Sequence, residues 1–149
     1  MKIYTETFKT IWANFDPNLH MRHTAYNDYA AEVRARFFKA HGFDLKAFSE
    51  NNLGPILFKE ETSFLREIQL GDDITIDLQL EAVSKGGERW KLKHNIYDKN
   101  GKLAAEIKIY GAWLDLKLRK LTSPPSEMVV ILNGLVKTES FEEIILTSK

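Results

Sequence analysis

Residues 16–26 read DPNLHMRHTAY, and this stretch joins a turn to the start of a long helix. Asp-Pro-Asn is typical of a turn, because Asp and Asn bond nearby backbone groups and Pro fixes φ. Beyond the turn, apolar side chains recur at three- and four-residue steps, which predicts a helix over residues 23–41. Its buried stripe comprises Tyr26, Tyr29, Ala30, Val33 and Phe37. Glu32 and Arg34 are expected on the polar face.

The remaining elements can be predicted on both sides of this helix. A strand is expected over residues 2–12, and a short helix over residues 45–50 with Asp44 as its cap. Four strands should follow, with a β-bulge near Gly111, and then a closing helix over about residues 125–137. We therefore predict one α+β domain over residues 1–149, in which an antiparallel five-stranded sheet wraps around the long helix.

The composition excludes several classes of protein. The 21 basic and 21 acidic residues give a formal charge of zero, which argues against general attraction to nucleic acid or to an anionic membrane. There are no cysteines, so thiol catalysis and cysteine-based zinc sites are excluded. No apolar run has the length of a signal peptide or membrane helix. We expect a cytoplasmic protein with neither nucleic-acid nor membrane partners.

The turn at residue 16 also places reactive side chains beside a helix start. Asp16 and His20 lie in a loop just before a first turn whose backbone N–H groups have no partner within the helix. Such groups suit an oxygen that gains negative charge during acyl transfer. Asp16 could then act as a nucleophile, or as a general base on water.

The spacing of Asp16, His20 and Tyr26, followed by Tyr29, Glu32 and Arg34, resembles hotdog-fold acyl-CoA thioesterases of the hydroxybenzoyl-CoA thioesterase type. Residues 70–74 are similar to the Gly-Asp step into the third strand of that family. Residues 115–125 are similar to its last strand and proline exit. The resemblance extends over roughly residues 3–125, through the order of strands and helices as well as the motif.

The resemblance implies a hydrolase that releases free acid and coenzyme A from an acyl-CoA, without a metal or cofactor. It implies a homodimer or homotetramer whose active site is shared across a subunit interface. The residues that it places at the catalytic centre are Asp16, His20 and His23, and those that it places on the substrate are Thr24, Ala25, Tyr26, Lys85 and Arg89. Backbone N–H groups of residues 23–25 would polarise the thioester carbonyl, and Tyr26 would line the acyl pocket. Lys85 and Arg89 would bind the phosphates of coenzyme A, or are ordinary solvated charges of a hairpin.

Three features depart from the pattern of the family. Asn14 stands where many members have another Asp, and Leu19 stands where many have Gly. Arg22 and His23 replace a pair of small amides. Leu19 could restrict the loop, because Gly tolerates backbone conformations that Leu does not. None of these changes removes Asp16.

Other interpretations of the same residues remain open. Asp16 could be only a turn residue, and His20 with His23 forms an H-x-x-H pair that would need a further ligand to hold zinc. A non-catalytic acyl-CoA binding module on the same fold is the first alternative function. A hotdog hydratase or dehydratase ranks third, because that chemistry pairs Asp with His differently. The acyl chain, the choice between coenzyme A and an acyl carrier protein, and dimer against tetramer stay undetermined.

Overall fold

A computed structural model of the chain describes residues 2–147. The elements in order are β1 (Tyr4–Lys9), a 3-10 turn η1 (Trp12–Asn14), α1 (His23–Ala40), α2 (Leu45–Glu50), β2 (Leu53–Phe64), β3 (Asp73–Ser84), β4 (Arg89–Tyr97), β5 (Leu103–Asp115), β6 (Lys120–Thr122), α3 (Ser126–Asn133) and β7 (Lys137–Ile144). The predicted α+β class is confirmed. No helix within residues 2–147 is long and apolar enough to cross a membrane.

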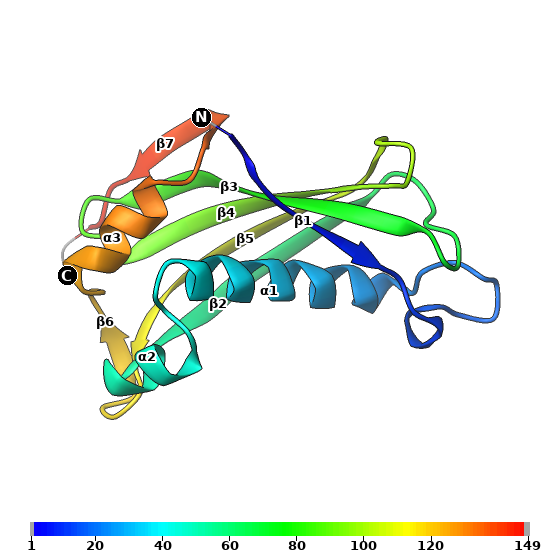
Figure 1. Cartoon of the computed structure of the whole chain (residues 1–149). Helices are drawn as coiled ribbons and strands as arrows, with labels where there is room; N and C mark the ends of the chain where they lie inside the picture. The colour runs from blue at the N-terminus through cyan, green and yellow to red at the C-terminus, as the bar shows by residue number, and fades with distance from the viewer. Residues whose placement is uncertain (1, 148–149) are drawn as a thin grey trace.

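The central sheet has the strand order β1-β3-β4-β5-β2, and all of its neighbouring strands are antiparallel. The sheet curves over α1, and the first turn of α1 lies at the end away from α3 and β7 (Figure 1). The alternating positions of β3 that face α1 are fully buried, as the period of two predicts: Ile74, Ile76, Leu78 and Leu80. The predicted stripe of α1 packs against them, so the core lies between the helix and the concave face of the sheet.

The C-terminal region differs from the prediction of a single closing helix. The last helix, α3, ends at Asn133, and β7 follows it. β7 pairs in parallel with the end of β3, next to β1 along the same edge. Its charged sequence, KTESFEEI, shows no clear alternation of apolar side chains, and its partly buried residues are Thr138, Phe141 and Ile144.

The predicted bulge near Gly111 exists, but its extra residue lies on the neighbouring strand. Phe58 of β2 is inserted opposite Gly111, whereas β5 keeps its alternation and buries Trp113. Gly111 is needed for a different reason. A Cβ atom there would lie 2.4 Å from the carbonyl oxygen of Ile56 and 2.5 Å from the ring of Trp90. The glycine therefore permits a close approach rather than a bulge in its own strand.

Arg34 is not on the solvated face of α1, where it was expected. Its side chain is half-buried, and its Nη1 donates to Nε2 of His94 at 2.9 Å. His94 in turn donates from Nδ1 to the carbonyl oxygen of Asp77 at 2.8 Å, since arginine can only donate. Burial, followed by the charge of Arg34, lowers the pKa of His94 to about 3, so its ring is neutral at pH 7. Glu32 does lie on the surface, paired with Arg36.

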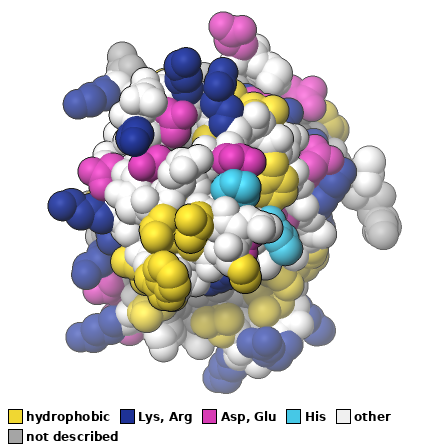
Figure 2. Space-filling view, turned by 90° about the vertical axis from the view of Figure 1, so that its right-hand side faces the viewer, with side chains coloured by type: hydrophobic (Ala, Val, Ile, Leu, Met, Phe, Trp, Pro, Cys, Tyr) yellow, Lys and Arg dark blue, Asp and Glu magenta, His cyan; other side chains and the backbone are white. Residues whose placement is uncertain are grey.

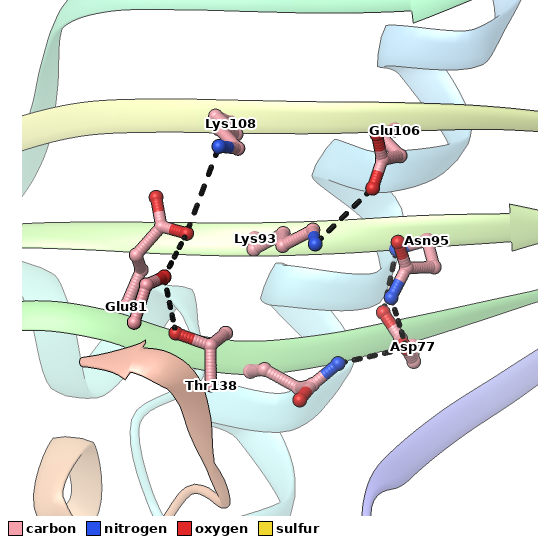
Figure 3. Close-up of polar contacts among 9 residues, drawn as sticks. Asp77, Glu81, Lys93, Asn95, Glu106, Lys108 and Thr138 are labelled. Atoms are coloured by element: carbon pink, nitrogen blue, oxygen red, sulfur yellow. Dashed lines mark hydrogen bonds and ion pairs between the residues drawn. The ribbon is translucent and has the colours of Figure 1, made fainter.

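The convex face of the sheet carries paired polar side chains that join neighbouring strands (Figure 3). Asp77 is buried there and accepts from the backbone and side-chain N–H groups of Asn95. Further pairs are Lys93 with Glu106 (3.1 Å), Lys108 with Glu81 (3.8 Å) and Ser140 with Glu81 (3.3 Å). Asp77 already has protein partners for both carboxylate oxygens, so this cluster supports the sheet and is not a reactive centre.

Candidate active site

The loop before α1 is a closed turn held by Asp16. Its Oδ1 accepts the backbone N–H groups of Asn18 (2.9 Å) and His20 (3.3 Å). The backbone of Asp16 also bonds to Leu19 and His20. These bonds use Oδ1 of the half-buried carboxylate, while Oδ2 has no hydrogen-bond partner among residues 2–147.

The β4–β5 hairpin contains the same turn, which serves as an internal comparison. Oδ1 of Asp98 accepts the N–H groups of Asn100 (2.9 Å) and Lys102 (3.0 Å). These backbone bonds, that of Lys102 first, lower the pKa of the Asp98 carboxyl. Turn formation alone therefore accounts for the contacts of Asp16, and the feature that sets Asp16 apart is its position.

Two main-chain hydrogen bonds place that turn against the start of α1. The N–H of Met21 donates to Ile68 (3.0 Å), and that of Arg22 donates to Asn14 (2.8 Å). The helix then begins at His23 without a side-chain cap, and its first turn contains no acidic residue. The side chain of Arg22 instead donates to the carbonyl oxygen of Ala13 (3.2 Å).

The first turn of α1 offers two backbone donors. Within residues 2–147, the N–H groups of His23 and Thr24 have no acceptor, whereas that of Ala25 donates to Arg22 at 3.0 Å. Together with the positive end of the helix dipole, these two donors form a place for an anionic oxygen. Of the three predicted backbone donors, residues 23–25, the structure therefore leaves the first two available.

The end of β2 and the segment between β2 and β3 also lie at this end of the molecule. Nε2 of His20 lies 3.1 Å from Oε2 of Glu67, and the ring of Tyr26 packs edge-on against Phe64 with centroids 5.0 Å apart. Tyr26 is buried, and burial, followed by the charge of Glu67, raises the pKa of its hydroxyl. Sequence analysis missed Glu67, because no local pattern relates it to His20.

Large apolar side chains surround this end of the molecule and remain exposed. Figure 2 shows them beside histidine and acidic side chains on one face. The exposed apolar residues in the loop after β1, at the end of β2 and in the segment after β2 are Ile11, Trp12, Leu19, Phe64, Leu65 and Leu70. The side chain of Trp12 is 74% exposed. Apolar side chains in this number around polar groups are typical of a surface that a ligand or partner covers.

The two basic residues predicted to bind coenzyme A do not lie near the Asp16 turn. Lys85 is exposed in the β3–β4 hairpin, and the Arg89 guanidinium lies 5.2 Å from the ring centroid of Phe58. This hairpin is at the end of the sheet opposite the start of α1 (Figure 1). One chain therefore does not bring Lys85 and Arg89 to Asp16.

His20 and His23 do not form part of a larger group of metal ligands. Within residues 2–147, no three His, Cys, Asp or Glu side chains gather closely enough to hold a metal ion.

A family model described as the thioesterase-like superfamily matches residues 11–132, which include the Asp16 turn, α1 and the whole central sheet except β1. The chain belongs to this superfamily. No curated protein matches the sequence.

Solved structures show that this member of the superfamily has the hotdog fold. A hypothetical protein from Staphylococcus aureus in complex with CoA aligns with TM-score 0.84 and 22% identity, covering 98% of this chain and 90% of that one. A 1,4-dihydroxy-2-naphthoyl-CoA thioesterase from Synechocystis aligns with TM-score 0.79 and 15% identity, covering 90% and 98%. A DHNA-CoA thioesterase from Staphylococcus aureus gives 0.77 and 15%, covering 92% and 99%.

The backbone of Leu19 is strained, and its replacement tests whether this strain lowers the stability of the protein. Its φ is +65°, the left-handed conformation that Gly101 adopts at +76° in the matching turn. Leu19→Gly should raise the free energy of unfolding by about 0.5–1 kcal/mol, because relief of the left-handed strain exceeds the entropy cost of glycine. Urea unfolding would measure the change.

Leu65→Gly is the matched control, since Leu65 is equally exposed but does not have a positive φ. It should lower the free energy of unfolding. A loss of stability in both variants would contradict the strain at Leu19.

Proposed function

We propose that the chain hydrolyses an acyl-CoA thioester at the start of α1. The observation that carries the proposal is the juxtaposition of the Asp16 turn with the available N–H groups of His23 and Thr24. Membership of the thioesterase-like superfamily supports the reaction class. A similar structure that contains CoA, and others named as CoA thioesterases, support the choice of carrier.

The main-chain donors act on the thioester carbonyl. Its oxygen would accept hydrogen bonds from His23 and Thr24, and the helix dipole would stabilise the negative charge that develops there. These donors are fixed before the substrate binds, because the bonds of Met21 and Arg22 hold the loop and the helix start together. The stabilisation therefore requires little rearrangement during the reaction.

Asp16 supplies the carboxylate in either of two routes. As a general base, Oδ2 takes a proton from water while the water oxygen bonds to the acyl carbon; the C–S bond then breaks and the thiolate takes the proton. As a nucleophile, Oδ2 bonds to the acyl carbon and expels the thiolate. Water then hydrolyses the anhydride: its hydroxyl goes to the acyl carbon, its proton goes to the thiolate, and the carboxylate is restored. Both routes yield free acid and coenzyme A, and both leave Oδ1 in the turn.

Other predicted residues take supporting positions in this proposal. Tyr26, with Phe64 against it, would form a wall of the acyl pocket. His20 would assist with orientation or proton transfer beside Asp16, since its backbone N–H is bonded to the same carboxylate. Lys85 and Arg89 would bind the phosphates of coenzyme A from a second copy of the chain.

The free edge of β2 is where a second copy would bind. Among residues 2–147, β2 pairs only with β5, and it exposes apolar side chains that include Leu57 and Phe58. An unpaired strand of this length is a template for pairing with another chain. In an antiparallel β2–β2 pair the two sheets run in opposite directions, so the partner's hairpin end would lie toward the Asp16 end of this chain. A homodimer would therefore complete the site.

Replacement of Asp16 tests the reaction most simply. Asp16→Asn keeps the turn but removes the charge, so kcat for thioester hydrolysis should fall by about 10²–10⁴-fold with little change in thermal midpoint. A free-thiol assay over a panel of acyl-CoAs gives the rates.

Asp98→Asn is the control, because it makes the same change in the same kind of turn, which leads into β5 rather than into a helix. Unchanged turnover in Asp16→Asn would eliminate the mechanism. Binding of acyl-CoA without any thiol release by the wild-type chain would instead favour a binding module.

Assembly through β2 is a separate prediction. Sedimentation equilibrium should show a dimer, and Leu57→Lys should weaken it by about tenfold or more, because two lysines would be buried together at the strand pair. Leu118→Lys is the control, since Leu118 is also exposed and apolar but lies in the turn after β5. A monomer with full activity would refute the shared site.

A further inference from the structure

Glu67 holds the imidazole of His20 from a segment that is itself fixed to the loop. The side chains meet at 3.1 Å, between Nε2 and Oε2. On either side of this contact, Met21 donates to the carbonyl oxygen of Ile68, and His20 forms an antiparallel bridge with Gln69. The backbones that carry both side chains are therefore held together independently of the pair.

The contact determines which nitrogen of a neutral His20 carries the hydrogen. Glu67 places a carboxylate oxygen 3.1 Å from Nε2, so a neutral ring is favoured with its hydrogen on Nε2, because a lone pair there would face a negative charge. In the neutral ring this leaves the lone pair on Nδ1. Within residues 2–147 no group donates a hydrogen bond to Nδ1 of His20.

The pair contributes little to folding, so stability does not explain it. The His20 side chain is 39% exposed and that of Glu67 is 61% exposed, and solvent screens an ion pair at such a place. Its position is distinctive, however. The backbone N–H of His20 donates to Oδ1 of Asp16, so the carboxylate is fixed relative to the backbone that carries the ring.

We propose that Glu67 is a positioning residue for the thioester hydrolysis. It fixes the ring and the tautomer of His20, so that Nδ1 accepts a hydrogen bond from the attacking water beside Oδ2 of Asp16. The inference rests on the proposed function. Asp16 and His20 are arranged in the same way. Contacts within the protein hold Oδ1 of Asp16 and Nε2 of His20, while Oδ2 of Asp16 and Nδ1 of His20 are left for the reaction.

The kinetic test compares Glu67→Gln with the wild-type protein. The amide keeps the shape but can donate as well as accept, so it no longer specifies the tautomer. We expect kcat to fall about 10- to 100-fold, toward the lower part of the range for a positioned base, while KM changes less than about threefold. In a His20→Gln background, Glu67→Gln should cause no further loss, because Glu67 acts through His20.

A spectroscopic readout separates positioning from a general structural role. In mildly alkaline buffer, the ¹⁵N shifts of His20 in the wild-type protein should be those of a ring protonated at Nε2 alone. In Glu67→Gln they should move toward the average of the two tautomers. Glu139→Gln is the control, since Glu139 is exposed on β7, at the end of the molecule away from the start of α1 (Figure 1), and it should change neither kcat nor the shifts.

The possible outcomes test the role of Glu67 separately from the proposed thioester hydrolysis. An active wild-type enzyme whose kcat is unchanged by Glu67→Gln would overturn the inference alone. An equal loss in the His20→Gln background, or mixed tautomers in the wild-type ring, would overturn it as well. Absence of thiol release from every acyl-CoA by the wild-type protein would overturn the proposed function itself.

Discussion

The loop before α1 is attached to the segments that follow β1 and β2, and the geometry of the candidate site depends on this attachment. One backbone bond ties Met21 to the segment after β2, and another ties Arg22 to the segment after β1. Because both come immediately before His23, they determine where the helix starts and which way its first N–H groups point. The core then holds the rest of the helix rigidly through its buried stripe, so core and site share one element.

The elements with strong local signals could be predicted from the sequence. The long helix was expected over residues 23–41 and spans His23–Ala40, because its apolar stripe repeats with the helical period. The short helix Leu45–Glu50 matches its prediction, and Asp44 caps it by accepting from Ala47 at 2.8 Å. The turn at Asp16 was also predictable, since its chemistry lies within five consecutive residues.

Features that depend on contacts between distant segments could not be predicted in this way. β7 is a strand because the end of β3 offers it an edge, and its own residues carry little periodic signal. Arg34 is drawn toward the sheet by His94, which lies on another strand. Glu67 meets His20 only because the loops after β1 and β2 lie side by side. In each case the partner, and not the local pattern, decides the outcome.

The comparison of the two Asx turns clarifies what the fold contributes to the site. Asp16 and Asp98 make the same bonds with the same residue spacing, yet only Asp16 is followed by a helix start. The reactive role that we propose for Asp16 therefore depends on its tertiary position. Leu19 is consistent with this view, because the turn keeps a left-handed residue there without the glycine that Asp98 has nearby.

A crystal structure with an unreactive acyl-CoA analogue, in which a methylene separates sulfur from the carbonyl, would test the central claim most directly. The account predicts that the carbonyl oxygen lies about 3 Å from the backbone nitrogens of His23 and Thr24. It also predicts that Oδ2 of Asp16 lies about 3–3.5 Å from the carbonyl carbon, or one water molecule away. A carbonyl bound elsewhere, with the Asp16 carboxylate directed into solvent, would contradict it.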